Sequence, residues 1–195
     1  VDPRAQAVTV DGRAVRPEAP VYLLLNKPRN MLCTSRDPQG RPTFHALLPD
    51  LPVRVYSVGR LDRDSEGLLL LTNDGELAHR LAHPRHHVDK TYEVWAARPL
   101  DAAERARMIG EGLWSEGEQL RMRAITAGRR TPGGWLHTAV LGEGRNRQIR
   151  RMFEALGVTV LRLRRVAMGP LRLGGLKVGA WRPLTPRERD QVNGL

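Results

Sequence analysis

A charged stretch in the first third of the chain has the composition of a catalytic loop. Residues 59–67 hold five charged side chains, and apolar segments precede and follow them. A charged loop between two apolar strands places its side chains at a sheet edge, where rigid neighbours hold them in position. Carboxylates placed there suit nucleophilic or acid–base chemistry. The alternative interpretation of the same composition is an ordinary solvated loop.

The net charge indicates a polyanionic partner. The chain has 32 Lys+Arg against 21 Asp+Glu, a formal net charge of +11, and only three of its cations are lysines. Arginine grips phosphate through two parallel hydrogen bonds and stacks on bases. Codon bias can explain the excess of arginine over lysine, but not the net charge, because acidic residues could have balanced it. The sequence therefore predicts a nucleic-acid partner.

The distribution of the charges separates a binding module from an enzyme. Residues 145–172 carry eight arginines and one acid, whereas residues 60–93 carry five cations and seven acids. A protein that only binds nucleic acid gains nothing from an acidic centre, since each carboxylate repels phosphate. An enzyme acting on RNA needs both a basic surface and a carboxylate. An RNA-binding module without chemistry remains the rival interpretation.

Several protein classes are excluded by what the chain lacks. The single cysteine, Cys33, rules out an intramolecular disulfide and a multi-cysteine zinc site. His79 and His83 are four residues apart and precede His86 and His87, but no acid completes a zinc-binding set, so we expect no metal. No apolar run is long enough to span a membrane and no signal segment opens the chain, so we expect a cytoplasmic protein.

The elements that position the charged loop predict an α+β fold. Strands outnumber helices and do not alternate with them regularly, which is typical of a mixed, mostly antiparallel sheet. We expect strands at 21–27, 31–34, 53–58, 68–71, 90–97, 118–126, 135–141 and 158–165, and a hairpin at 8–15 that turns at Asp11-Gly12. We expect helices at 43–48, 73–83, 101–109, 146–157 and from Thr185 onward.

Residues 59–75, GRLDRDSEGLLLLTNDG, resemble the signature loop of the RsuA/RluB-type family of ribosomal RNA pseudouridine synthases. Other motifs of that family follow the same order along the chain. They are LNKP at 25–28, DPQGRP at 37–42, KTYEV at 90–94, EGRNRQIRRM at 143–152 and MGPL at 168–171. The resemblance covers residues 20–190. It implies the two-subdomain fold of that family, with a mixed, mostly antiparallel sheet and flanking helices.

The resemblance also implies roles for three residues. Asp62 matches the catalytic carboxylate, Tyr92 the active-site tyrosine, and Arg150 the arginine that pairs with the catalytic aspartate. Such a pair would keep Asp62 ionised and oriented, and Tyr92 would stack on the base or serve as a proton acceptor. Considered without the resemblance, Tyr92 is an ordinary core aromatic and Arg150 a solvated helix residue.

The neighbours of these residues complete the expected site. Apolar side chains beside the catalytic positions would form the wall of the base pocket, and polar ones would contact RNA. The expected pocket residues are Leu61 and Ile149, and the expected RNA contacts are Arg60, Arg145, Asn146, Arg147 and Arg151.

The activity implied is isomerisation of uridine to pseudouridine in ribosomal RNA. The target base must leave the helix before its glycosidic bond can break, and the reaction needs no cofactor. The stretches at 37–42 and 174–184 favour 23S over 16S RNA as substrate, with a 16S enzyme as the alternative. We expect a monomer in which residues 20–195 form the catalytic domain and residues 1–19 are a remnant of an upstream S4-like RNA-binding domain with its linker.

Overall fold

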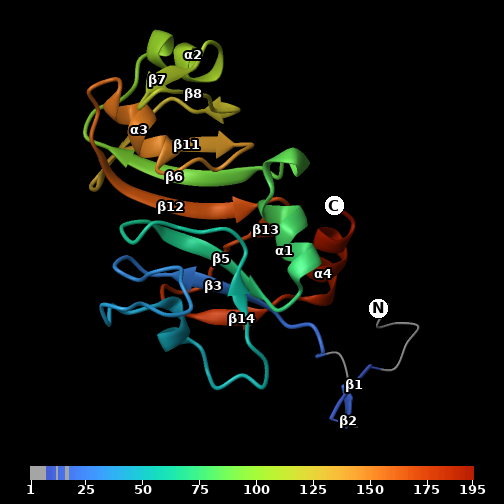
Figure 1. Ribbon diagram of the computed structural model, residues 1–195. Helices are drawn as coiled ribbons and strands as arrows, with labels where there is room; N and C mark the ends of the chain where they lie inside the picture. Colours follow the sequence, from blue (N-terminus) through green and yellow to red (C-terminus); the bar gives the residue numbers. More distant parts are fainter. Residues whose placement is uncertain (1–7, 12, 16–17) are drawn as a thin grey trace.

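A computed structural model describes residues 8–11, 13–15 and 18–195 of the chain (Figure 1). A ten-stranded mixed sheet runs through its length, with the main order β10-β11-β6-β12-β5-β3-β14. These strands span Arg129–Thr131, Gly134–Leu141, Lys90–Ala96, Val160–Met168, Glu66–Thr72, Tyr22–Lys27 and Trp181–Pro183. Three short strands pair at its sides: β4 (Tyr56–Ser57), β9 (Ala124–Ile125) and β13 (Leu171–Arg172). The predicted α+β class with a mixed, mostly antiparallel sheet is confirmed.

The sheet consists of two antiparallel halves joined along one line. Strands β10, β11, β6 and β12 form one half, and β5, β3 and β14 form the other (Figure 1). Among the pairings of the described strands, β12 with β5 is the parallel one, and its register has two residue pairs, Arg164 with Glu66 and Arg165 with Gly67. We call this line, with Glu66–Leu68 of β5 and Arg162–Arg165 of β12, the seam.

The seam depends on a glycine and on two arginines, of which Arg165 is buried. Gly67 has a φ of +105°, and a Cβ added there would lie 2.2 Å from the carbonyl oxygen of Arg165. Only glycine therefore allows the two strands to approach this closely. Arg165 is buried and donates from Nε to the carbonyl of Leu68 at 2.8 Å, and Arg162 donates from Nε to the carboxylate of Glu66 at 2.7 Å.

The run of leucines in β5 is explained by burial on both faces. Leu68 and Leu70 pack in one apolar cluster, and Leu69 and Leu71 pack in another on the opposite face. Side chains alternate across a strand, so a strand covered on both faces is apolar throughout. The other half of the molecule has its own core, formed largely by β6, β11, α2 (Ala102–Ile109) and α3 (Gln148–Glu154).

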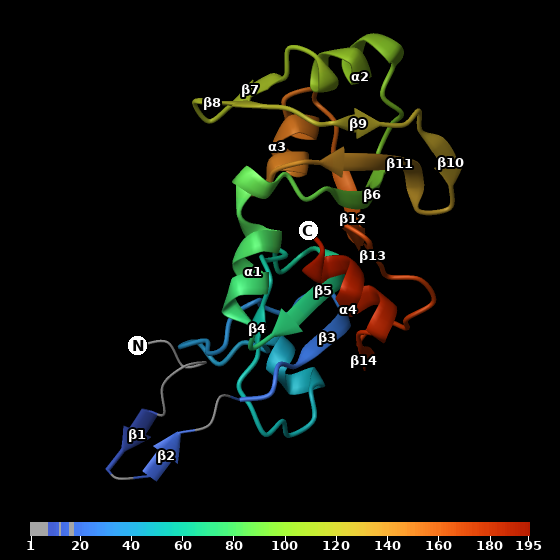
Figure 2. The same cartoon turned by 90° about the vertical axis from the view of Figure 1, so that its right-hand side faces the viewer.

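Three of the four α-helices in the described residues begin after a capping side chain. Asp74 accepts from the backbone of Leu77 ahead of α1, and Asp101 and Thr185 form capping boxes ahead of α2 and α4. Figure 2 shows α1 and α4 together on one side of the β5 half. The helices are α1 (Gly75–Ala82), α2 (Ala102–Ile109), α3 (Gln148–Glu154) and α4 (Pro186–Asn193), with 3₁₀ turns η1 (Phe44–Leu47) and η2 (Pro84–His86).

The predicted hairpin is confirmed by the antiparallel strands β1 (Val8–Val10) and β2 (Arg13–Val15), although Gly12 of its turn lies outside the described residues. The strand predicted at 31–34 is wrong. The N–H of Leu32 instead bonds to the carbonyl of Pro42 across the loop, at 3.0 Å, leaving one isolated bridge between Leu32 and Thr43.

Two other predicted strands are shorter in the structure. The strand expected at 53–58 reduces to β4, and the one at 118–126 divides into β8 (Glu118–Leu120) and β9 because the backbone of Met122 bonds to the end of α2. The chain also forms β7 (Leu113–Ser115), which pairs with β8, and β10, neither of which the sequence predicts. Among the described residues, no helix has both the length and the apolar character needed to cross a bilayer.

Candidate active site

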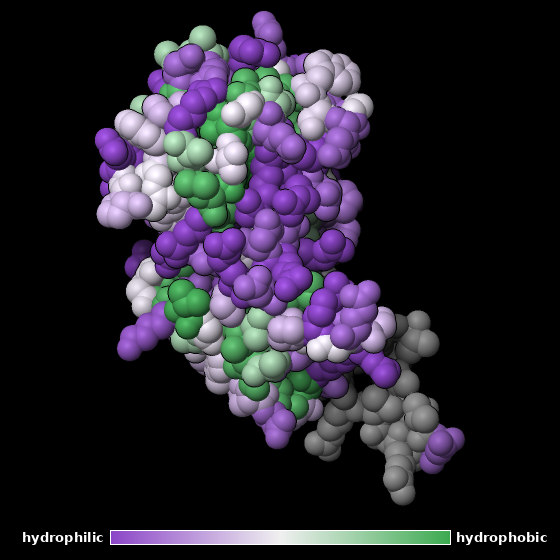
Figure 3. Space-filling model, turned by 90° about the vertical axis from the view of Figure 1, so that its left-hand side faces the viewer, coloured by the Kyte–Doolittle hydropathy of each residue, from purple (hydrophilic) through white to green (hydrophobic). Residues whose placement is uncertain are grey.

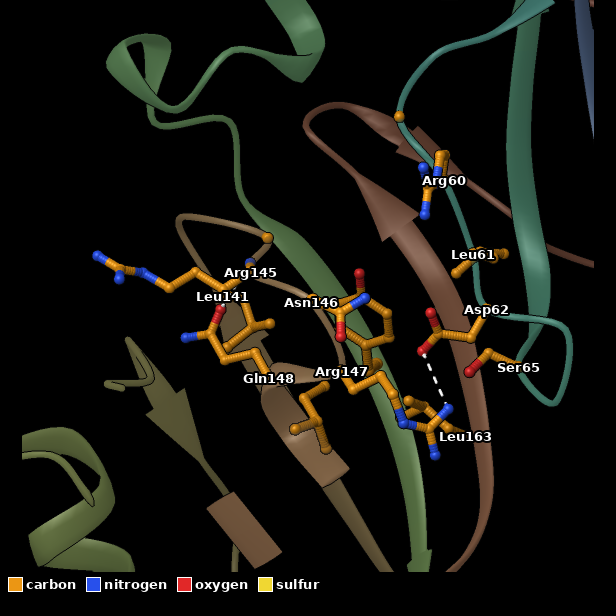
Figure 4. Close-up of a pocket in the computed structure, with 14 residues that line it drawn as sticks. Arg60, Leu61, Asp62, Ser65, Leu141, Arg145, Asn146, Arg147, Gln148 and Leu163 are labelled. Atoms are coloured by element: carbon orange, nitrogen blue, oxygen red, sulfur yellow. Dashed lines mark hydrogen bonds and ion pairs between the residues drawn. The ribbon is translucent and has the colours of Figure 1, made fainter. Parts of the chain in front are cut away.

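A cavity of about 360 Å³ opens between the two halves of the sheet. Figure 3 shows the side of the molecule that lies at the left of Figure 1, where α3 and the loop before β5 are found. Hydrophilic side chains form a band across the middle of this side. The volume of the cavity suits a small ligand or a single extruded base. The lining residues are Gly59–Asp62 and Ser65 before β5, Tyr92 of β6, Leu141 of β11, Gly144–Ile149 around the start of α3, and Leu163 of β12 (Figure 4).

The loop that carries Asp62 is fixed from beneath by a buried lysine. Lys27 is fully buried, and its Nζ donates to the backbone carbonyls of Ser65 at 2.8 Å, Pro28 at 3.0 Å and Asp62 at 3.2 Å. Burial lowers the pKa of Lys27, while the thiol of Cys33 and the nearby carboxylates favour its charged form. The ammonium group therefore holds the backbone on both sides of the charged turn.

We expect Lys27→Met to lower activity by about 100-fold in a folded protein, because a loop displaced by an ångström misplaces its carboxylate. The methionine retains the apolar stem but leaves three carbonyls without their donor. Turnover and circular dichroism of the variant are the measurements, and Lys177→Met, at an exposed lysine, is the control. Wild-type turnover by Lys27→Met would contradict the positioning role.

Asp62 and Tyr92 come from different halves of the sheet and meet at this cavity. The Asp62 side chain is 30% exposed and points into the cavity in Figure 4. Tyr92 is buried on β6 and lines the same space, as do the apolar side chains of Leu61 and Ile149. A carboxylate beside an aromatic and aliphatic wall can receive a flat base and place its sugar near an oxygen nucleophile.

Arg150 is not the partner of Asp62, so the predicted pairing is wrong. Its Nε lies 3.2 Å from a carboxylate oxygen of Asp64, and its Nη2 donates to the Asp64 carbonyl at 3.3 Å. A third donor, Nη1, bonds to the carbonyl of Val160 at 3.2 Å. Asp64 lies two residues further along the loop than Asp62, and its carboxylate is the one that contacts Arg150 of α3. Burial lowers the pKa of Arg150, and Asp64 partly offsets this.

Arg147 is the cation beside Asp62. Its Nη1 lies 3.9 Å from Asp62 (Figure 4) and 3.3 Å from Asp64, so one guanidinium bridges both carboxylates. Arg147 has a left-handed backbone, with a φ of 48°, at the N-cap of α3. A side chain larger than glycine is uncommon there, and such conformations cluster at functional sites.

Arg151 faces away from the cavity, which contradicts its predicted role as an RNA contact. It is buried and contacts the carboxylate of Glu118 at 2.8 Å, that of Glu116 at 3.3 Å, and the carbonyl of Ser115. The ion pairs connect α3 to the β7–β8 hairpin, so this arginine has a structural position. Arg60, Arg145 and Asn146, in contrast, line the cavity, and their contact with RNA stays a prediction.

We expect Arg147→Ala and Arg151→Ala to have opposite phenotypes. Arg151→Ala should lower the free energy of unfolding by about 2 kcal/mol, since it removes a buried side chain and leaves the carbonyl of Ser115 without its donor. Arg147→Ala should leave stability near wild type but reduce the salt dependence of RNA binding by about one counterion. Urea unfolding and binding titrations across a salt series test both, and a wild-type salt slope in Arg147→Ala would contradict the assignment.

Six lining residues were not predicted from the sequence: Gly59, Ser65, Leu141, Gly144, Gln148 and Leu163. Gln148 is buried, donates to the carbonyl of Arg121 at 2.8 Å and accepts from the backbone of Arg145 at 3.2 Å, so it fixes the turn before α3. Its place between Arg147 and Ile149 in the motif at 143–152 was the available signal. Nothing comparable pointed to Leu163, which β12 brings in from a distant part of the chain.

The histidines lie together without forming a metal site. The ring centroids of His79 and His83 are 4.9 Å apart, and Arg85 donates to Nε2 of His86 at 2.9 Å. Within residues 18–195 and the β1–β2 strands, no three His, Cys, Asp or Glu side chains have an arrangement that could hold a metal ion.

Comparison with known proteins identifies the family of this fold. Residues 21–155 match the RNA pseudouridylate synthase family. The chain is 39% identical to the ribosomal large subunit pseudouridine synthase B of Bacillus subtilis, covering 96% of this chain and 78% of that protein. It is 40% identical to the enzyme of the same name from Pseudomonas aeruginosa, covering 94% of this chain and 50% of that protein.

A solved structure supports the same assignment. The crystal structure of a pseudouridylate synthase superposes with a TM-score of 0.78 at 35% identity, covering 90% of this chain and 75% of that one. The fold is thus that of an enzyme that isomerises uridine in RNA. The chain belongs to the RsuA/RluB-type family of RNA pseudouridine synthases.

Proposed function

We propose that this enzyme converts one specific uridine of 23S ribosomal RNA to pseudouridine, with Asp62 as its catalytic carboxylate. The single observation that carries the proposal is the meeting of Asp62 and Tyr92 in one cavity with an apolar wall. Two relatives named for the large ribosomal subunit and the net charge of +11 support ribosomal RNA as the substrate.

The cavity accounts for the steps that the isomerisation requires. The bond from C1′ of the ribose to N1 of uracil breaks, the freed uracil turns, and a bond from C1′ to C5 forms. The proton on C5 is lost to solvent and N1 regains a proton. Asp62 acts either as a nucleophile at C1′ or as the base that forms an eliminated sugar. Tyr92, Leu61 and Ile149 retain the uracil and exclude water while it turns.

Two arginines of α3 and its N-cap lie beside the carboxylates of Asp62 and Asp64. Arg147 lies beside both Asp62 and Asp64, and Arg150 holds Asp64 together with its backbone carbonyl. Arg147 therefore places a positive charge beside the carboxylate that either route of bond cleavage uses. Arg60, Arg145 and Asn146 line the exposed side of the cavity, where the strand that carries the target must lie.

The proposal is tested by mapping pseudouridines in ribosomal RNA from cells with and without this protein. We expect one 23S position to lose its modification, and the purified enzyme to release tritium from C5-labelled uridine in a fragment that contains it. Loss at a 16S position instead would move the substrate to the small subunit. An unchanged modification map together with tight RNA binding would favour an RNA-binding assembly factor.

A further inference from the structure

A second hollow, of about 520 Å³, adjoins the cavity on the other side of the catalytic loop. The two share Arg60, Leu61, Asp62 and Arg147 as walls, so a chain leaving one enters the other directly. The remaining walls come from the loop after β3 and from the loop before β5. They are Leu32, Cys33, Thr34, Arg36, Asp37, Pro38, Arg41 and Arg63.

The loop after β3 is held in shape by its own carboxylate. Asp37 accepts from the backbone N–H groups of Gln39 at 3.1 Å and Arg41 at 2.8 Å, and Arg41 Nη2 reaches its other oxygen at 2.7 Å. These bonds lower the pKa of Asp37 to about 2. The Asp37 carboxylate therefore stabilises the conformation of this loop, and Arg41 neutralises its charge.

Three arginines around the hollow lack such a partner. Arg36, Arg60 and Arg63 are exposed, and no carboxylate of the described residues lies within ion-pair distance of any of them. Elsewhere in the same structure arginines pair readily, as Arg162 does with Glu66 and Arg182 with Glu188. Like charges gathered around a concave surface repel one another and raise the local concentration of anions.

We propose that this hollow binds the phosphodiester next to the target uridine, on one side of it, through Arg36 and Arg63. The inference rests on the proposed action on RNA and adds to it a second subsite outside the base pocket. When the target ribose lies at Asp62, the adjoining phosphate must lie just past Asp62, where this hollow begins. Its walls are mostly polar and charged, so it suits a sugar–phosphate backbone rather than a particular base.

The test compares wild type with Arg36→Ala/Arg63→Ala on three 23S fragments. One fragment is unmodified, and the other two carry a neutral methylphosphonate at the phosphate 5′ or 3′ of the target. We expect the double variant to lose about tenfold in kcat/KM on the unmodified fragment, with the saturating single-turnover rate unchanged. One methylphosphonate should cost wild type a similar factor and cost the variant nothing further.

A matched control removes the same charge from distant helices, in Arg107→Ala/Arg187→Ala on α2 and α4, and should retain wild-type kcat/KM. Equal methylphosphonate penalties in wild type and the double variant would overturn the proposal, as would unchanged kcat/KM in the variant. A reduced saturating rate would overturn it too, because the arginines would then serve the chemistry. Absence of turnover by wild type would instead refute the proposed substrate.

Discussion

Asp62→Asn should abolish pseudouridine formation, reducing turnover by about 10³-fold or more, while the fold and most RNA affinity remain. The amide has nearly the shape of the carboxylate but cannot act as a nucleophile or a base. It also removes a charge that repels phosphate, so RNA affinity should stay level or rise slightly. Tritium release from C5-labelled uridine, beside a binding titration, measures both quantities. Loss of binding in step with activity would give Asp62 a structural role.

Asp64→Asn is the matched control, since it makes the same chemical change two residues away in the same loop. Asp64 pairs with Arg150 at 3.2 Å and with Arg147 at 3.3 Å, and it does not line the cavity. We expect a partial loss of about tenfold through a loosened loop. Substantial turnover by Asp62→Asn with none by Asp64→Asn would transfer the catalytic role to Asp64.

Gly67→Ala should have the largest effect on stability, lowering the free energy of unfolding by about 4 kcal/mol. Two costs add at this position. The residue has a φ of +105°, and a Cβ would lie 2.2 Å from the backbone oxygen of Arg165, which cannot move without opening the seam. Urea unfolding followed by circular dichroism measures the change.

Gly157→Ala separates the two costs. Gly157 also has a positive φ, of +66°, but a Cβ there would meet nothing within 4 Å. We expect it to cost only the backbone strain, about 1 kcal/mol. Similar destabilisation by both substitutions would show that β5 and β12 approach less closely than the structure has them.

Elements with local signals could be predicted from the sequence. The caps at Asp101 and Thr185 give the starts of α2 and α4, and the leucines of β5 indicate a buried strand. The strands β7 and β10 could not be predicted, because each has three residues and depends on a neighbouring strand for its hydrogen bonds. Such strands lack a hydrophobic period of their own.

Most residues of the site could be predicted from the sequence, but its ion pairs could not. Motif order gave Asp62, Tyr92 and the turn into α3, all of which the structure brings to one cavity. To decide whether Arg150 pairs with Asp62 or with Asp64, one must know the direction in which each loop carboxylate points. The spacing of residues in the sequence does not give that direction. Arg151 was misassigned for a related reason: the hairpin that buries it is distant in sequence and had not been predicted.

Substitutions at the seam should disable this enzyme more readily than substitutions in either core. Asp62 precedes the strand on one side of it, and Tyr92 and Arg147 belong to the half on the other side. Catalytic groups must keep their separation within about 0.5 Å, whereas each core needs only to remain apolar and filled. The cores can therefore accumulate substitutions independently of each other. Glu66, Gly67 and Arg165 have no such freedom, because a change at any of them disturbs the contact between the two halves and so the separation of the catalytic groups.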